Sequence, residues 1–138
     1  MSRSGYGYED GDDLWSMIRW RGAVQSAIRG RRGQQLLREL AEAMDAMPVK
    51  RLIADELEKG GEYCAMGVVG VARGIPLDHI NPEDIERVAD TFGIADALAR
   101  EIVYQNDEGA FRPREESPEA RWGRMRAWVD EQLRNSEL

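Results

Sequence analysis

The residues with the most reactive side chains are one cysteine, one histidine and an asparagine–aspartate pair. Cys64 opens the apolar stretch "CAMGVVGVARG", and a thiolate is favoured at a helix N-terminus. Cysteine catalysis also needs a base, usually histidine, and His79 is the sole histidine of the chain. Asn106 and Asp107 would complete a triad-like set, but no spacing brings these groups together. We therefore expect a buried structural cysteine and no catalytic residue.

The asparagine–aspartate pair follows directly on a helix that we expect over residues 95–105. In that position it is either a C-terminal helix cap followed by a turn or a recognition element. Both interpretations stay open, and Asn106 and Asp107 are counted among the candidate binding residues.

Neither a metal nor a cofactor is expected. One histidine, one cysteine and scattered acids lack the ligand spacing of a metal site. The glycines of "GRRG" at residues 30–33 lack the strand and the spacing of a phosphate-binding loop.

Arginines form the strongest candidate binding patch. They lie in the first quarter of the chain: Arg19, Arg21, Arg29, Arg31 and Arg32. We expect Arg31 and Arg32 to lie in an exposed turn, "GRRG", and Arg21 and Arg29 to share one side of a helix. The planar guanidinium suits carboxylates and phosphates, so Arg21, Arg29, Arg31 and Arg32 are predicted to bind a partner. The alternative is a solvated face paired with the acidic half of the chain.

Charge is distributed unevenly along the chain. The net charge is -7, but residues 14–51 carry a net +5 and residues 52–138 a net -9. An acidic protein gains nothing overall from the phosphate attraction that drives most nucleic-acid binding. A basic face can still act locally, so nucleic acid remains a possible partner for the arginine patch.

The stretch "FGIADALAREIVYQND", residues 92–107, has the spacing of the second half of a helix-turn-helix. Readers of DNA present Arg, Lys, Asn or Gln to base edges. Here we expect Asp96, Arg100, Glu101 and Gln105 on the exposed side, and two of these four are acids. A packed helical hairpin is therefore favoured over a DNA-reading unit.

Hydrophobic periodicity and capping signals predict five or six helices. The first begins after Asp12 or Asp13, with an apolar stripe of Leu14, Met17, Ile18, Val24 and Ile28, and its Gly22 marks a close helix contact or a break. The second runs from Gln34 to about Met47, antiparallel to the first. Another is capped by Asn81, with Pro82 in its first position, and ends at Gly93. The last begins at Ser117-Pro118-Glu119.

Residues 50–65 are ambiguous between a β-hairpin around Lys59-Gly60-Gly61 and a helical turn, and we favour the short hairpin. Small residues line one face of the helix that follows, which ends at Gly74. The fold class is thus mainly α, a single compact helical domain. Its expected core comprises Leu37, Leu40, Met44, Val68, Val88, Phe92, Ile102 and Trp122.

A chain of 138 residues is close to the usual size of one domain. We expect a disordered tail over residues 1–10 and one helical domain over residues 11–138. No apolar run reaches the length of a membrane span, and the acidic N-terminus has no apolar core typical of a secretory signal. With one cysteine and no internal disulfide, these features predict a cytoplasmic protein without a membrane partner.

Four stretches together resemble a family of small, uncharacterised phage and prophage proteins: "IRWRGAVQSAIRGRRGQQLLREL", "KRLIADELEKGGEYCAMGVVGVARG", "FGIADALAREIVYQND" and "SPEARWGRMRAWV". The resemblance covers about residues 12–133. It implies a small accessory gene of a mobile element, of the kind that often encodes inhibitors of host defence or regulators. It implies no catalytic residues, because that family has no established activity.

The leading hypothesis is a phage-encoded accessory protein, not an enzyme, that binds a host protein or ribonucleoprotein in the bacterial cytoplasm. An anti-CRISPR or other counter-defence inhibitor is one such role. The first alternative is a nucleic-acid-binding regulator that uses the Arg-rich N-terminal segment. The second is a thiol enzyme that uses Cys64. The oligomeric state is left open.

Overall fold

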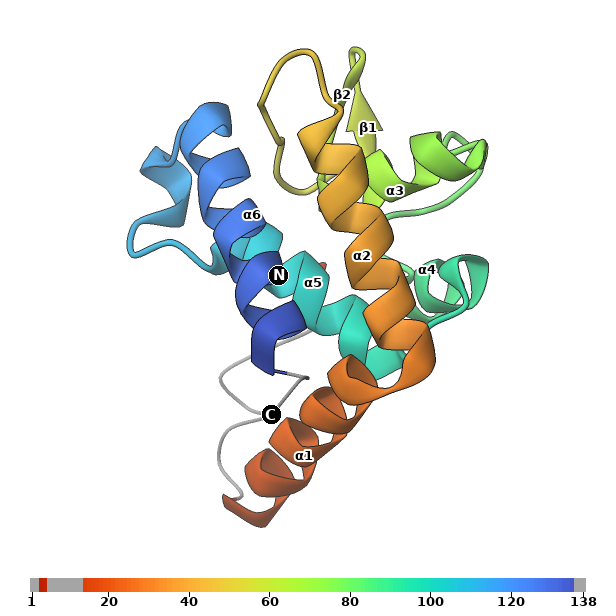
Figure 1. The fold of residues 1–138 in the computed structure, drawn as a ribbon, viewed down its shortest axis with the longest axis vertical. Helices are drawn as coiled ribbons and strands as arrows, with labels where there is room; N and C mark the ends of the chain where they lie inside the picture. The colour runs from red at the N-terminus through yellow and green to blue at the C-terminus, as the bar shows by residue number, and fades with distance from the viewer. Residues whose placement is uncertain (1–2, 5–13, 136–138) are drawn as a thin grey trace.

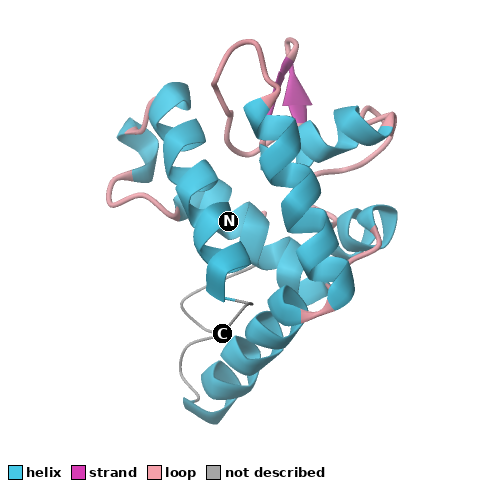
Figure 2. Ribbon diagram, viewed as in Figure 1, coloured by secondary structure: helices cyan, strands magenta, loops and turns pink. Residues whose placement is uncertain are grey.

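A computed structural model describes residues 3–4 and 14–135 of the chain. Within these residues the protein is mainly helical with one short antiparallel hairpin (Figure 1, Figure 2), which confirms the predicted fold class. In chain order the elements are α1 (Leu14–Arg29), α2 (Arg31–Asp45), β1 (Glu58–Lys59), β2 (Glu62–Tyr63), α3 (Ala65–Arg73), α4 (Ile85–Phe92), α5 (Asp96–Glu108), the 3-10 helix η2 (Pro113–Glu115) and α6 (Pro118–Asn135).

Helix α5 is the centre of the arrangement. It packs against α1, α3, α4 and α6, while α2 packs against α3 and α6. In Figure 1, α1 extends from the body at the lower end of the molecule. The first half of α1 therefore has few neighbours, and this explains the exposure of its apolar side chains described below.

The junction between α1 and α2 differs from the predicted four-residue turn. Gly30 alone separates the helices, with extended backbone at φ -67° and ψ 161°, and α2 begins at Arg31. Gly33 lies inside α2, where an added Cβ would stand 2.0 Å from the carbonyl oxygen of Ala27. This glycine thus permits close packing rather than a turn. The antiparallel pair was a wrong expectation, because α2 leads on from the end of α1 at an angle (Figure 1).

The hairpin near residues 50–65 is confirmed. Its strands pair Glu58 with Tyr63 and Lys59 with Glu62. Gly60 and Gly61 take positive φ values of 61° and 80°, a conformation that glycine adopts without steric cost. The backbone N–H of Gly61 also donates to Glu58 Oε2 at 2.8 Å.

The small residues of α3 allow neighbouring segments to pack closely against the helix. An added Cβ at Gly67 would stand 2.0 Å from the carbonyl oxygen of Leu57, and one at Gly70 would stand 2.6 Å from the side chain of Leu77. The small face thus lets Leu57, before the helix, and Leu77, after it, lie against α3. Gly74, at φ 73°, ends the helix as predicted.

Two helix boundaries on either side of Gly93 were wrongly predicted. Asp84 caps α4, accepting from the backbone N–H of Arg87, whereas Asn81 accepts from Glu83 in the preceding turn. Gly93 ends α4 at φ 69° as expected. Helix α5 continues to Glu108, so it includes the asparagine–aspartate pair. Its last carbonyl groups have a partner, because the guanidinium of Arg124 donates to the oxygens of Gln105 and Asn106.

The predicted core is correct for seven of its eight residues. Leu37, Leu40, Met44, Val68, Val88, Phe92 and Ile102 are buried. Trp122 is half-buried and packs against the core instead. Helix α6 begins as expected after Ser117, and Lys50 Nζ lies 5.5 Å from the centroid of the Trp122 ring.

The apolar stripe of α1 continues beyond the core. Val24 and Ile28 are buried, but Leu14, Met17 and Ile18 are 65%, 45% and 52% exposed. Gly22 has no atom within 4 Å of an added Cβ, so it marks neither a close contact nor a break. Periodicity identified the stripe correctly, but only its C-terminal half has a neighbouring helix to bury it.

Some expectations concern residues outside the described ranges, namely the caps Asp12 and Asp13 and most of the tail over residues 1–10. Two residues of that tail, Arg3 and Ser4, are described, and both are buried against α5. In the part of the chain that the structure describes, no helix has the length and apolar character needed to cross a membrane.

Candidate binding surfaces and a buried polar network

The structure argues against a DNA-reading helix-turn-helix. The second helix, α5, is packed on several sides by other helices and cannot enter a groove. Glu101, which was expected on the exposed side, is buried, and its carboxylate accepts from Arg21 at 3.2 Å. Helix α1 packs against α5 and covers the side of it that was expected to be exposed.

Cys64 is buried, as predicted. It caps α3, and its Sγ accepts from the backbone N–H of Gly67 at 3.4 Å. The side chain of His79 is 79% exposed, with Nε2 3.8 Å from Asp78 Oδ1. No hydrogen bond joins the cysteine and the histidine within the described ranges. The geometry therefore offers Cys64 no nearby general base.

Asn106 lies at the centre of a buried polar network that joins three segments. Its Oδ1 accepts from the backbone N–H of Ala65, the first residue of α3, at 3.1 Å. Its Nδ2 donates to the carbonyl of Ile53 at 2.9 Å and to Asp107 Oδ1 at 2.8 Å. The amide thus connects α5 to the start of α3 and to the loop before the hairpin. These contacts explain why the side chain is buried.

Asp107 completes this network from the next position of α5. Its Oδ1 accepts from the backbone N–H of Asp55 at 3.1 Å and from Arg3 Nη2 at 2.8 Å, and its Oδ2 accepts from Arg3 Nε at 2.6 Å. The two paired side chains are 2% and 3% exposed. A carboxylate so deeply buried needs such a partner, because an unpaired buried charge is strongly destabilising.

The charge of Arg3 is secure in this environment. Burial lowers the pKa of its guanidinium, but Cys64 and Asp107 raise that pKa by more, so the net value lies above the ordinary 12.5. Arg3 is therefore a cation at neutral pH.

The predicted arginine patch divides into two parts. Arg21 is paired with Glu101 on α5, and its side chain is 53% exposed. Arg32 is exposed and donates to the carbonyl of Gly93 at 3.3 Å. The side chains of Arg29 and Arg31 are exposed and make no hydrogen bond or ion pair with another described residue. The junction of α1 and α2 thus brings three arginines together.

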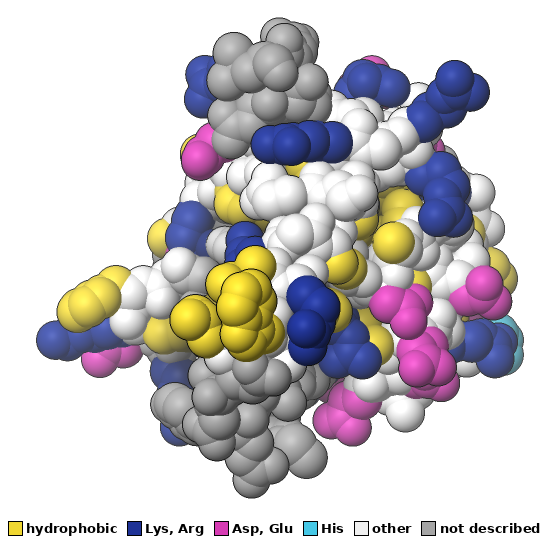
Figure 3. Space-filling model, turned by 90° about the horizontal axis from the view of Figure 1, so that it is seen from below, with side chains coloured by type: hydrophobic (Ala, Val, Ile, Leu, Met, Phe, Trp, Pro, Cys, Tyr) yellow, Lys and Arg dark blue, Asp and Glu magenta, His cyan; other side chains and the backbone are white. Residues whose placement is uncertain are grey.

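Apolar side chains are exposed on α1, the helix that ends at Arg29. Trp15 is 67% exposed, beside the exposed Leu14, Met17 and Ile18. Figure 3 views the molecule from the α1 end and shows hydrophobic side chains next to Lys and Arg side chains on that face. We call this surface the α1 face, defined by the exposed residues Leu14, Trp15, Met17, Ile18, Arg19, Arg29, Arg31 and Arg32.

The structure does not bring Asn106 and Asp107 to the α1 face. They lie near the C-terminal end of α5, with the loop before the hairpin and the start of α3. Arg21 instead pairs with Glu101 in the middle of α5, and Arg32 donates to Gly93, which ends α4. The two predicted sets of binding residues are therefore separate. A binding role for Asn106 and Asp107 stays a prediction, and the buried network gives them a structural role as well.

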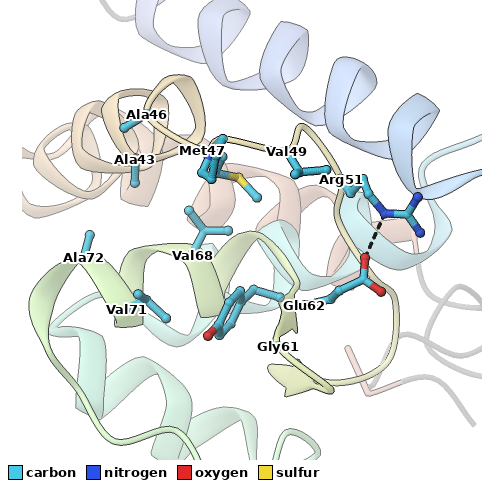
Figure 4. A pocket seen from close by; sticks show the side chains of 12 residues that line it. Ala43, Ala46, Met47, Val49, Arg51, Gly61, Glu62, Val68, Val71 and Ala72 are labelled. Carbon is cyan, nitrogen blue, oxygen red and sulfur yellow. Dashed lines mark hydrogen bonds and ion pairs between the residues drawn. The ribbon is translucent and has the colours of Figure 1, made fainter.

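A separate apolar hollow lies between the C-terminal end of α2, the hairpin and α3 (Figure 4). Its volume is about 510 Å3, and Met47, Val68 and Val71 line it. At its edge Arg51 donates to Glu62 at 2.9 Å. Val71 is half exposed, so the hollow is open to solvent.

Arg3 and Asp55 were missed by sequence reasoning. Arg3 belongs to a Gly- and Ser-rich tail, and Asp55 to a stretch with ambiguous structure. One signal was present: Asp107 is in a helix with no basic residue three or four positions away. A buried aspartate without a local counter-charge requires a distant one.

No protein-family model, curated protein or solved structure matches the chain. The resemblance to phage and prophage proteins therefore stays a prediction. Among the described residues, no group of three or more His, Cys, Asp or Glu side chains is placed to hold a metal ion.

Proposed function

We propose that this protein is a non-catalytic binding protein that recognises an acidic macromolecular surface through its α1 face. The observation that carries the proposal is a run of 25 positions, residues 14–38, with six arginines and no Asp or Glu. Apart from Arg38, which has Glu42 four positions further along α2, the arginines of this run can reach acids only on other elements or on another molecule. Arg29 and Arg31 reach none among the described residues.

The chemistry of the α1 face favours recognition over catalysis. A guanidinium stays protonated in proteins and cannot act as a general base or as a nucleophile at neutral pH. It does present a fixed fork of donors that matches carboxylates and phosphates. Exposed aromatic and aliphatic groups beside it supply area that is desolvated on binding, and Trp and Arg are enriched in binding hot spots.

A protein partner is favoured over nucleic acid by the apolar part of the face. Leu14, Met17 and Ile18 gain little from a sugar–phosphate backbone but can be buried against apolar side chains. The net charge of -7 also opposes long-range attraction to nucleic acid. Trp15 favours the second candidate, nucleic-acid binding, because an exposed indole near arginines can stack on an unpaired base.

The resemblance to prophage proteins adds a biological setting to this proposal. The partner is then a host protein or ribonucleoprotein in the bacterial cytoplasm. Inhibition of a defence system such as CRISPR is one function that such binding serves.

The test is a pull-down from host cells with tagged protein, with and without nuclease, comparing the natural chain with the double variant Arg29→Glu and Arg31→Glu. The helix dipole favours a carboxylate at Arg31, the first residue of α2, and disfavours one at Arg29, the last residue of α1, so the two effects oppose each other. Exposed substitutions usually change stability by less than about 0.5 kcal/mol. We expect the variant to fold normally and to lose a protein partner that survives nuclease treatment.

The matched control is Arg87→Glu with Arg134→Glu, which makes the same change in net charge at two exposed positions outside the α1 face. It is expected to retain the partner. Equal loss in both variants would mean that overall charge, not the α1 face, controls binding. A partner that disappears on nuclease treatment supports the nucleic-acid alternative.

A further inference from the structure

The pairing of Arg3 with Asp107 has the geometry of a ligand in its site. Arg3 places two guanidinium nitrogens, Nε and Nη2, on the two carboxylate oxygens at 2.6 and 2.8 Å. Such a bidentate arrangement is the strong and specific form of this interaction. The partners are 104 positions apart in the chain, and Arg100 additionally donates to the carbonyl of Ser4 at 3.0 Å.

The carboxylate of Asp107 is held in place by groups other than Arg3. Its Oδ1 accepts from Asn106 Nδ2 and from the backbone N–H of Asp55. Asp55 has a φ of 70°, in the left-handed region that non-glycine residues seldom adopt. The strained residue directs its N–H at the carboxylate. The anion is therefore oriented before any cation arrives, and its burial makes a cation necessary.

The fit of Arg3 in this position is incomplete. Its third guanidinium nitrogen, Nη1, is buried and makes no hydrogen bond of normal geometry in the described part of the chain, although the Cys64 thiol lies close enough to Arg3 to raise its pKa. A cleft of about 1000 Å3 adjoins the pair and is lined by Arg3, Asp107 and Asp55. Three further acids line the same cleft, Glu83, Glu108 and Glu115, and so do three arginines, Arg112, Arg114 and Arg121. Without Arg3 the lining therefore holds five acids against three arginines, which leaves room and a net negative charge for a cationic peptide.

We propose that Asp107 forms the floor of a guanidinium-binding site, which Arg3 fills in this chain and which accepts an arginine side chain from another molecule when Arg3 leaves. This site is separate from the α1 face and does not depend on the function proposed for it. Lysine is a poor substitute, because a single ammonium cannot reproduce the fork that spans both carboxylate oxygens.

The test is chemical rescue of the full-length variant Arg3→Ala with N-acetyl-L-arginine amide. Removal of Arg3 leaves Asp107 buried without a cation, so the melting temperature should fall. A ligand that binds only the folded state raises that temperature in proportion to its occupancy. We expect a saturable rise of several degrees with the arginine amide, and little change with N-acetyl-L-lysine amide or with the natural chain.

Two further variants keep the proposal falsifiable. Arg3→Ala combined with Asp107→Asn should not respond to the arginine amide, because the carboxylate is gone. Arg3→Lys retains a positive charge if Arg3→Ala fails to fold, and it too should be stabilised by the arginine amide. The proposal is overturned if neither single variant responds, if the lysine amide acts equally well, or if the double variant responds as strongly.

Mixing experiments distinguish the two sources of an arginine side chain. Asp107→Asn chains keep an unused Arg3, and Arg3→Ala chains keep an empty site. A heterodimer of these two chains, seen by light scattering after size-exclusion chromatography, identifies a second copy as the donor. Rescue by the arginine amide without heterodimer formation identifies an arginine-bearing peptide of a different protein as the ligand.

Discussion

Arginine performs opposite tasks in two regions of this molecule. Around the C-terminal end of α5, Arg3, Arg121 and Arg124 are buried or half-buried, and carboxylates or carbonyls hold each of them. On α1 and the start of α2, Arg29 and Arg31 are exposed and unpaired among the described residues. The difference lies in the acids within reach rather than in the arginines themselves. Under the proposed function, this exposed region is the one that a partner binds.

The largest loss of stability should come from removing the buried hydrogen bonds of Asn106. Asn106→Leu keeps the side-chain volume similar but leaves the N–H of Ala65 and the carbonyl of Ile53 without their partner. Each orphaned buried group costs about 1–3 kcal/mol, so the loss should be about 3 kcal/mol or more. Urea unfolding followed by circular dichroism measures it. Gln35→Leu, on an exposed position of α2, is the control. A loss below 1 kcal/mol would show that water replaces the amide there.

A glycine in the same region should be the next most sensitive position. Gly67→Ala places a Cβ 2.0 Å from the carbonyl oxygen of Leu57, so the backbone must shift. Overpacking of this kind typically costs about 1–3 kcal/mol. The midpoint of urea unfolding should fall accordingly. An unchanged midpoint would mean that the loop before the hairpin can shift without a cost in stability.

A glycine-to-alanine substitution should instead raise the stability of the protein when it is made on α1. Gly22→Ala adds a Cβ with no atom within 4 Å, in the interior of a helix. Alanine is favoured over glycine there by up to about 1 kcal/mol. The variant should therefore unfold at a higher urea concentration than the natural chain. Destabilisation instead would indicate that α1 must bend at this position.

The smallest effect concerns a paired arginine on the outside of the molecule. Arg73 donates to both oxygens of Glu39 at 3.0 and 2.6 Å, and this hydrogen bonding lowers the pKa of Glu39 below its ordinary 4.5. Because the pKa of Glu39 is lower in the folded state, its ion pair with Arg73 stabilises the fold above pH 4.5. This stabilisation is lost as the pH falls through the folded-state pKa.

Glu39→Gln tests this pH dependence. The pair is partly solvated, so the variant should lose at most about 1 kcal/mol at neutral pH. The difference between variant and natural chain should shrink on acidification. A constant difference from neutral to acid pH would assign the effect to packing rather than to charge.

The parts of the fold that followed from sequence are those with one buried face. Helices α2 and α4 show a clear apolar stripe, because each packs on one side only. Glycines with positive φ, at the hairpin and at the ends of α3 and α4, were identifiable from local chemistry. These signals are local, so no tertiary information was needed to interpret them.

The errors have a common physical origin in long-range packing. Gly33 resembles a turn residue in sequence, and only the approach of Ala27 shows that it is a packing residue. Glu101 was expected on the exposed side of its helix and Asp107 in a cap or a recognition element, yet both are buried and paired with arginines distant in the chain. Leu14 continues a correct apolar stripe past the end of its neighbouring helix. None of these partners is determined by residues nearby in the chain.

The capping role of Cys64 makes it a built-in reporter for the region around Asn106. It is the one thiol in the sequence, and it is 1% exposed at the position just before Ala65, whose N–H bonds to Asn106. A thiol reagent can react only with molecules in which the start of α3 has opened. When closing is faster than the chemical step, the labelling rate relative to that of a free thiol gives the free energy of this local opening. The dynamics of the network can thus be followed in the natural chain, with no label added beforehand.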